Sequence, residues 1–345
     1  MAAVPGEGDT GAGILLTGVT GYFGAFLLSE LLAATDRTGQ RISCLIRAED
    51  AGHARRRLRA NLAQYHLWDP SAAERVDVVV GDLARPRLGL SSDDYARLAA
   101  GIDTIFHNGA QVNHLLSAGH LEAANVDGTR ALIQLAAEGR PKRLHFMSTP
   151  AVADNADSGY AESKRRSESL LRDAVSEGVF ACVYRLPRLA PDSRTGLPNV
   201  NDIMIRLLDI ILQLGFAPDA AAAEYWVAVD AAATAIVQAA GQARGGEVFA
   251  LRSPEPVTLR LVVDIAVEAG FAIAFEPLER WVERVRGLGL GDYDVTLGVL
   301  GLDGADVAGP AEAAGGLEKY GTPIIAPGSA REDLKRYFVQ RRSGF

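Results

Sequence analysis

Short apolar runs alternate with amphipathic segments along the first 190 or so residues of the chain. Each apolar run has the length of a β-strand, whereas the segments between the runs repeat their apolar positions with the period of a helix. Strands that alternate with helices in this way predict βαβ units and a parallel sheet wound on both faces. The predicted strands lie within residues 13–18, 41–47, 75–83, 103–110, 142–149 and 178–186.

The pattern changes after the last of these strands. A turn-rich stretch at residues 191–202 precedes an amphipathic helix at 203–215. Within residues 225–240 a strand leads into a helix for which Asp230 is the expected N-cap, and Thr258 is expected to begin a later helix. The predicted fold class is α/β: a Rossmann-like, doubly wound parallel sheet with a smaller, mostly helical C-terminal substrate domain.

Composition places the chain among globular proteins. It has 345 residues, of which 48% are hydrophobic, and this length allows two domains. No uncharged apolar stretch reaches the roughly 18 residues of a membrane-spanning helix, and the N-terminus has no secretory pattern. We therefore expect a cytoplasmic, monomeric domain without a membrane partner.

Charge and cysteine content exclude further classes. The net charge of −8 argues against nucleic acid as a partner, because binding to duplexes depends on a basic surface. The two cysteines, Cys44 and Cys182, lie in apolar runs without ligand partners, which indicates core packing. His107 and His114 have no acidic or cysteine partner at ligand spacing, so no metal site is expected. Lysine is scarce, occurring at four positions: Lys142, Lys164, Lys319 and Lys335.

A glycine motif follows the first predicted strand. The string TGVTGYFG places Gly18, Gly21 and Gly24 between a strand and a helix. Gly18 suits a tight turn, Gly21 a close approach to a pyrophosphate, and Gly24 close packing of helix on strand. The helix N-terminus would face the phosphates, so the motif favours dinucleotide binding over a plain tight turn.

The end of the second predicted strand favours NADPH over NADH. NAD sites commonly carry an acidic residue there, whereas this strand ends in Arg47. A guanidinium complements a 2′-phosphate in charge and geometry, although Arg47 could also be a solvated residue at a strand end. Arg55, Arg56, Arg57 and Arg59 follow on the next helix, and one of them could assist.

Tyr160 and Lys164 are the candidate catalytic pair. They lie four residues apart in GYAESK, on one face of a predicted helix. The lysine charge is expected to lower the pKa of the phenol and so to allow proton exchange near neutral pH. Upstream, Ser148 and Thr149 end a strand at the sheet edge where ligands bind, and a hydroxyl there could hold a carbonyl oxygen.

With these motifs in place, the sequence resembles the extended short-chain dehydrogenases/reductases. Within them it is similar to the thioester reductase domains that terminate nonribosomal peptide synthetases, polyketide synthases and carboxylic acid reductases. The resemblance runs through nearly the whole chain. Its most specific strings are CLIRA, GDLARPRLGL, HNGAQVN and DSRTG.

The resemblance implies a role for each matching residue. Thr149, rather than Ser148, would form the catalytic trio with Tyr160 and Lys164. NADPH would reduce an acyl or peptidyl thioester carried on the phosphopantetheine arm of a carrier protein, giving an aldehyde and in some members an alcohol. The expected cofactor-binding residues are Thr17, Gly18, Thr20, Gly21, Tyr22, Phe23, Gly24, Arg47, Arg57, Asp82, Leu83, Asn108, Gly109, Ala110, Ser148, Tyr160, Lys164 and Leu186.

The chain departs from the family pattern in the segment before Tyr160, which is shorter than usual, and at Arg165, where a tryptophan is common. Two alternatives stay open: a sugar-nucleotide epimerase or dehydratase on the same scaffold, which would favour an acid in place of Arg47, and a non-enzymatic NADPH sensor. We expect residues 10–198 and 225–252 to form the NADP-binding domain. Residues 199–224 and 253–345 would form the substrate and carrier-docking domain.

Overall fold

The computed structural model describes residues 12–113, 116–153, 158–220, 223–287 and 321–343. The chain divides into two compact units, each built from separate stretches of sequence. The first unit comprises Met1–Leu186, Ala232–Leu251 and Glu318–Ile324, and the second comprises Pro187–Ala231, Arg252–Leu317 and Ile325–Phe345. The two units are described separately below.

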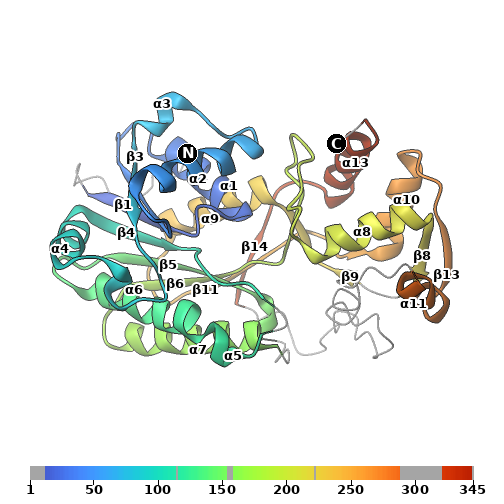
Figure 1. The fold of residues 1–345 in the computed structure, drawn as a ribbon. Coiled ribbons are helices and arrows are strands. Elements are labelled where there is room, and N and C mark those ends of the chain that lie inside the picture. The colour runs from blue at the N-terminus through green and yellow to red at the C-terminus, as the bar shows by residue number, and fades with distance from the viewer. Residues whose placement is uncertain (1–11, 114–115, 154–157, 221–222, 288–320, 344–345) are drawn as a thin grey trace. The chain divides into compact units, whose positions relative to one another are not determined.

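An eight-stranded sheet forms the centre of the first unit (Figure 1), in the order β14-β11-β6-β5-β4-β1-β2-β3. Every pairing from β3 across to β11 is parallel, and the predicted strands are all present. The order reverses between β1 and β4, which creates the switch point where ligands bind in open α/β sheets. The strands are β1 (Gly13–Thr17), β2 (Ile42–Ile46), β3 (Val76–Val80), β4 (Ile102–His107), β5 (Arg143–Ser148), β6 (Ala181–Arg185), β11 (Val248–Arg252) and β14 (Thr322–Ile325).

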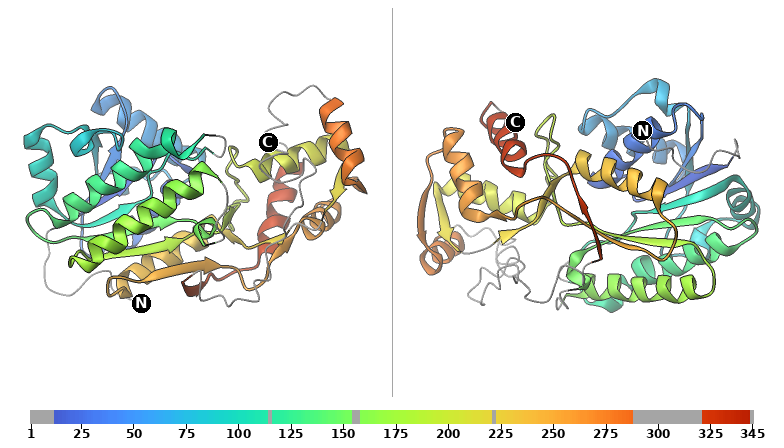
Figure 2. Two further views of the ribbon diagram at one scale, coloured as in Figure 1. Left: turned by 90° about the horizontal axis from the view of Figure 1, so that it is seen from below. Right: turned by 180° about the vertical axis from the view of Figure 1, so that it is seen from behind.

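Helices cover both faces of this sheet, which confirms the doubly wound α/β class (Figures 1 and 2). One face carries α1 (Tyr22–Ala34), α2 (Ala51–Gln64) and α9 (Val229–Gln242). The other face carries α4 (Ser92–Gly101), α6 (Gly128–Ala137) and α7 (Gly159–Ser176). Shorter elements complete the unit: α3 (Pro70–Ala73), η1 (Pro86–Gly89), α5 (Ala118–Leu121), the π-helix η2 (Glu122–Asp127) and η3 (Pro150–Val152).

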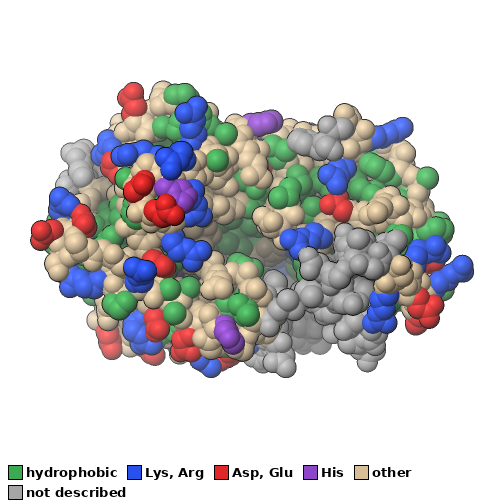
Figure 3. Space-filling model, viewed as in Figure 1, with side chains coloured by type: hydrophobic (Ala, Val, Ile, Leu, Met, Phe, Trp, Pro, Cys, Tyr) green, Lys and Arg blue, Asp and Glu red, His purple; other side chains and the backbone are tan. Residues whose placement is uncertain are grey.

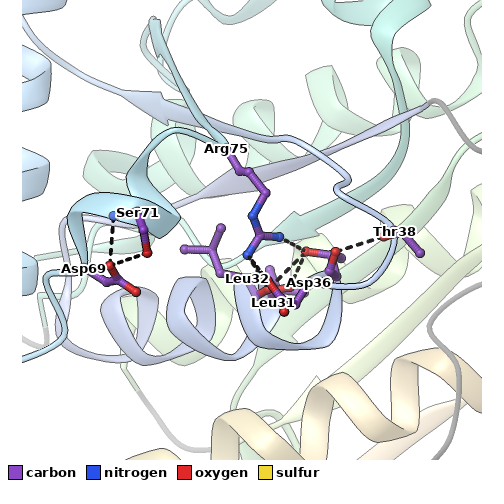
Figure 4. Close-up of polar contacts among 8 residues, drawn as sticks. Leu31, Leu32, Asp36, Thr38, Asp69, Ser71 and Arg75 are labelled. Atoms are coloured by element: carbon purple, nitrogen blue, oxygen red, sulfur yellow. Dashed lines mark hydrogen bonds and ion pairs between the residues drawn. The ribbon is translucent and has the colours of Figure 1, made fainter.

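Polar contacts close the C-terminal end of α1, where the last carbonyl groups of a helix have no partner within it. Arg75, just before β3, donates from Nη2 to Leu32 O at 2.9 Å and from Nη1 to the Thr35 hydroxyl at 3.2 Å (Figure 4). Thr35 Oγ1 in turn donates to Leu31 O at 2.7 Å. These bonds fix the return of the chain from α1 toward β2.

The second unit is built mainly from helices around its own apolar core. The helices are α8 (Ile203–Leu214), α10 (Leu259–Glu268), α11 (Leu278–Gly287) and α13 (Ala330–Arg342). Short strand pairs join them: β7 (Arg188–Ala190) with β10 (Trp226–Ala228), β8 (Phe216–Asp219) with β13 (Ala274–Pro277), and β9 (Ala223–Glu224) with β12 (Val257–Thr258). Trp226, Trp281 and Phe338 are buried in this core.

One of the two predicted helix caps is correct and the other is wrong. Thr258 caps α10 by accepting a hydrogen bond from Leu261 N at 3.0 Å. Asp230 lies inside the first turn of α9, because β10 leads directly into the helix at Val229. The Asp230 carboxylate instead accepts hydrogen bonds from the amide and hydroxyl of Ser193, at 3.0 and 2.6 Å.

Both cysteines are buried, as their apolar surroundings predict. Burial raises the pKa of the Cys44 thiol above its usual range, and burial beside Glu247 raises that of Cys182 to about 12. On the face of the first unit seen in Figure 3, Lys and Arg side chains are interspersed with Asp and Glu side chains. Within the described ranges, no helix combines the length and apolar character needed to cross a membrane.

Candidate active site

The glycine motif forms a tight loop between β1 and α1. Gly18 has φ +72°, and a Cβ on it would lie 2.7 Å from Gly109 N, so only glycine fits. A Cβ on Gly24 would lie 2.1 Å from Gly18 O, so this glycine lets the helix pack against the loop. A Cβ on Gly21, the N-cap of α1, would meet only Gly18 O at 3.4 Å, leaving the outer side of the loop open.

A buried polar chain connects this loop to the neighbouring strand across the switch point. Thr17 Oγ1 accepts a hydrogen bond from Gly109 N at 2.8 Å and lies 2.9 Å from His107 Nδ1. Asn108 Nδ2 donates to Gly18 O at 3.2 Å. Burial and the nearby Lys164 hold the pKa of His107 well below its usual range, so its ring is neutral. His107 is therefore a packing and hydrogen-bonding group, as the sequence predicts.

Helix α2 braces the glycine loop through a residue that the sequence analysis missed. Asn61 Nδ2 donates to Val19 O at 3.0 Å and to Gly21 O at 3.1 Å. Both carbonyl oxygens are held by one amide, and this fixes the loop between them. No motif signals Asn61, because its role depends on how α2 packs against α1.

Arg47 and Arg57 lie together at the end of β2. Arg47 is exposed, and its carbonyl oxygen accepts a hydrogen bond from Arg57 Nη1. Arg59, one turn along α2, lies over the ring of Trp68 with its guanidinium carbon 5.4 Å from the ring centroid. Arg47 and Arg57 are thus the arginines from this stretch that the structure brings together beside the sheet edge.

The loop after β3 packs beneath the β4 end. Leu83 Cδ1 would lie 2.6 Å from a Cβ on Gly109, and Leu83 also contacts Gly128 closely. Asp82 is held inside its own loop, where its carboxylate accepts from Ala84 N at 2.9 Å and its amide donates to Leu88 O at 2.8 Å. Asp82 and Leu83 therefore lie next to the Asn108–Ala110 segment on the same edge of the sheet.

The remaining predicted cofactor residues contribute mainly backbone. Tyr22 and Phe23 are buried, and Tyr22 packs edge-on against Phe26 and Tyr65. Their side chains belong to the core, so the N–H groups of the first turn of α1 are what this segment offers to an anion. Thr20 and Ala110 are partly buried, and Leu186 N donates to Ser148 O at 3.0 Å.

The candidate catalytic groups meet at the end of β5. Thr149 follows this strand, and its hydroxyl oxygen accepts from Ala151 N at 3.3 Å. The hydroxyl proton of Thr149 has no acceptor within the described part of the chain. Lys164, one turn after Tyr160 on α7, is buried and donates from Nζ to Met147 O at 2.7 Å. Its Nζ also lies 4.4 Å from the centroid of the Phe146 ring.

The pKa of Tyr160 differs from the sequence-based expectation. Burial raises it to about 12, whereas a neighbouring lysine was expected to lower it. The Lys164 ammonium is directed to the Met147 carbonyl, and burial lowers its own pKa to about 7 while Glu168 opposes this shift. The phenol is therefore protonated at neutral pH, which is the form that a proton donor requires.

A buried acidic residue anchors this arrangement, and the sequence analysis missed it. Glu168, one turn after Lys164, accepts from Ser148 Oγ at 2.6 Å and from Arg185 Nη2 at 2.6 Å. The Ser148 hydroxyl is therefore committed to Glu168, whereas the Thr149 proton is not committed. The available signal was the position of Glu168, four residues after Lys164 on the same helix face.

Asn125 is a second residue that the sequence analysis did not single out. It lies in the π-helix η2, and its amide bonds the backbone of Gln111 in both directions, at 2.7 and 3.1 Å. The same side chain donates to Ser163 Oγ on α7 at 2.9 Å. Asn125 thus ties the loop after β4 to the helix that carries Tyr160. π-Helical turns of this kind are frequent at functional sites.

The structure describes no metal site. Within the described ranges, no group of three or more His, Cys, Asp or Glu side chains could hold a metal ion. His114, the second histidine of the loop after β4, lies outside the described residues.

Fold and site together define a dinucleotide-binding protein of the extended short-chain dehydrogenase/reductase class. Comparison with known proteins agrees with this class. The NAD-binding family model described as "Male sterility protein" matches residues 16–159 and 153–236. A linear gramicidin synthase from Brevibacillus parabrevis is 36% identical over 309 residues, which are 83% of this chain and 6% of that protein. The isonitrile lipopeptide synthase of Streptomyces coeruleorubidus is 35% identical over 79% of this chain and 20% of that protein, so the chain spans a small part of each relative.

Solved structures narrow the assignment. The terminal R domain from the myxalamid PKS-NRPS biosynthetic pathway is 31% identical with a TM-score of 0.83, and the match covers 99% of this chain and 93% of that one. The reductase (R) domain of a nonribosomal peptide synthetase from Mycobacterium tuberculosis is 25% identical with a TM-score of 0.78, over 99% and 94% of the two chains. The chain belongs to this family of terminal reductase domains of nonribosomal peptide and polyketide synthases.

Proposed function

We propose that the chain catalyses the NADPH-dependent reductive release of an acyl or peptidyl thioester from the phosphopantetheine arm of a carrier protein. The observation that carries this proposal is the set of three groups at the end of β5: the Thr149 hydroxyl, the Tyr160 phenol and the buried Lys164 ammonium. They lie on the same edge of the sheet as the glycine loop. Membership of the reductase family supports the assignment of a redox reaction.

The residues present fit a nicotinamide dinucleotide. Gly18 and Gly24 allow the loop to close tightly, and the open side of Gly21 leaves room for a pyrophosphate at the N-terminus of α1. Arg47 and Arg57 would hold the 2′-phosphate, and their charge supports NADPH over NADH. Leu83 and Asn108–Ala110 would line the adenosine and nicotinamide portions. NADPH would supply a hydride to the thioester carbonyl.

The chain's own residues would hold the substrate and supply a proton. Thr149 can donate its free O–H to the carbonyl oxygen, and Tyr160, protonated at neutral pH, can give that oxygen a proton. The buried positive charge of Lys164 favours the phenolate that remains. In balance, a thioester, NADPH and one proton yield an aldehyde, a free thiol and NADP⁺.

The decisive assay follows NADPH oxidation together with aldehyde and thiol release from a panel of acyl-pantetheine and acyl-carrier thioesters. Tyr160→Phe should lower kcat by about 10³-fold while leaving NADPH binding unchanged, because it removes only the proton donor. Failure of the wild-type protein to turn over any thioester would exclude the proposal. Turnover of a sugar nucleotide with bound NAD would establish the alternative enzyme, and NADPH binding without any turnover would favour a sensor.

The second unit is the proposed site of carrier docking and substrate selection. This division assigns the cofactor to residues 10–198 and 225–252, and the carrier to residues 199–224 and 253–345. Charge-reversal variants across the exposed arginines of α13 should raise KM for an acyl-carrier substrate without changing KM for the matching acyl-pantetheine. Equal effects on the two substrates would remove the docking role.

A further inference from the structure

Glu168 joins three elements at the point where the candidate catalytic groups converge. Its carboxylate accepts from Ser148 Oγ at the end of β5, at 2.6 Å, and from Arg185 Nε and Nη2 at the end of β6, at 3.1 and 2.6 Å. All three side chains are nine-tenths or more buried. Each carboxylate oxygen therefore has a charged or hydroxyl donor, which makes this a rigid buried anchor.

The anchor lies beside Lys164, which is also buried. Lys164 and Glu168 are one turn apart on α7, and Lys164 Nζ donates to the carbonyl of Met147, the residue before Ser148. Leu186 N donates to Ser148 O from the strand on the other side. The end of β5 is thus held by an ammonium and a carboxylate from the same helix.

We propose that Glu168 is a positioning residue for the reduction: it binds the Ser148 hydroxyl and keeps Lys164 charged, so that Thr149 is the hydroxyl left to the substrate. The inference rests on the proposed function for its catalytic meaning. Its physical content is independent of turnover, because it states that the charge of Glu168 sustains the charge of Lys164 and that the charge of Arg185 opposes it.

The charged and titratable groups around Lys164 make the sign of each effect clear. Glu168 and Tyr160 face it from α7, His107 from β4 and Arg185 from β6. His107 is neutral, so Glu168 supplies the stabilising charge and Arg185 the opposing charge. Neutralising Glu168 should make Lys164 lose its proton at lower pH. Neutralising Arg185 should make Lys164 keep its proton to higher pH.

The test is a direct titration of Lys164 in the full chain. Selective ¹³Cε labelling gives few signals, because the chain has only four lysines, and Lys164→Gln identifies the relevant one. We expect the midpoint to fall by about one pH unit in Glu168→Gln and to rise by about one in Arg185→Met. Lys142, which is buried elsewhere against the carbonyls of Glu138 and Arg140, should keep its midpoint in both variants.

Opposite shifts distinguish the inference from a general loss of structure, which would move both midpoints in the same direction. Unchanged midpoints, or shifts of one sign, would overturn it. If Glu168→Gln does not fold, Arg185→Met alone must still raise the midpoint. Glu168→Asp, which keeps the charge, should restore a midpoint near that of the wild-type protein.

Kinetics then connect the anchor to the reaction. If Lys164 must be charged, kcat/KM falls as pH rises through its titration, and this alkaline limb should move down in Glu168→Gln and up in Arg185→Met. A wild-type protein that turns over no thioester would remove the proposed function and leave the titration result standing. Normal turnover with unmoved limbs and midpoints would remove only the role of Glu168.

Discussion

Gly21 and Gly24 lie three residues apart in one loop, yet their surroundings predict different consequences of the same substitution. Gly24→Ala places a Cβ 2.1 Å from Gly18 O, against backbone that cannot move aside. We expect it to lower the free energy of unfolding by about 3 kcal/mol. Gly21→Ala meets only one atom, at 3.4 Å, and should cost about 1 kcal/mol through the weaker helix cap.

Binding should reverse the order of these two variants. The Cβ added at Gly21 would occupy the open side of the loop, so Gly21→Ala should raise the Kd for NADPH about tenfold or more. Urea unfolding and fluorescence titration measure the two effects. A Gly21→Ala protein that binds NADPH with wild-type affinity would show that the pyrophosphate lies elsewhere.

Arg47 is the residue that should select the cofactor. It is exposed at the end of β2, where a 2′-phosphate would lie, and Arg47→Asp replaces an attractive charge by a repulsive one. We expect the Kd for NADPH to rise at least 100-fold and the Kd for NADH to change little. Arg37→Asp makes the same charge change on the exposed turn after α1 and should leave both values unchanged. Equal losses for the two cofactors in Arg47→Asp would contradict the assignment.

At the scale of elements, α2 acts on the glycine loop through Asn61. Replacing Asn61 by Leu removes the amide that holds the carbonyls of Val19 and Gly21. The loop then loses a fixed conformation before the cofactor binds, so the Kd for NADPH should rise about tenfold, at a cost of about 1.4 kcal/mol. Gln64→Leu, an exposed change on the same helix, is the control. Equal affinities in the two variants would show that the brace does not matter for binding.

The elements themselves were largely predictable, whereas the bonds between them were not. Strands such as residues 41–47 show as apolar runs, and the glycine motif indicated the β1–α1 turn. Asp230 was misassigned because the strand before it leads straight into the helix and Ser193 takes its carboxylate. Asn61 and Glu168 escaped notice because each acts on a segment distant in sequence, which no local pattern records.

At the scale of the molecule, each unit has its own core, and the second unit contains a pH-sensitive group. Burial and the nearby Asp230 raise the pKa of Asp333 to about 6, with Asp192 and Glu332 acting in the same direction and Arg336 opposing them. A carboxyl group with a raised pKa binds its proton more tightly in the folded state. Its contribution to stability is therefore present at low pH and lost as pH rises.

The wild-type protein should accordingly lose up to about 3 kcal/mol of stability in the second unit between pH 4 and pH 6 through this group. Asp333→Asn should remove this part of the pH dependence. Urea unfolding followed by tryptophan fluorescence suits the test, because Trp226 and Trp281 are buried in this unit. Asp264→Asn, on the exposed face of α10, should retain the wild-type dependence. Parallel curves for wild type and Asp333→Asn would refute the prediction.

The burial of both native thiols has a practical consequence for trapping the carrier complex. Cys44 and Cys182 are inaccessible, and their raised pKa values suppress the reactive thiolate. A single cysteine introduced on the surface of the second unit would therefore be the one reactive thiol of the chain. A maleimide attached to a pantetheine arm could then be captured at one chosen position after another, without first removing native cysteines.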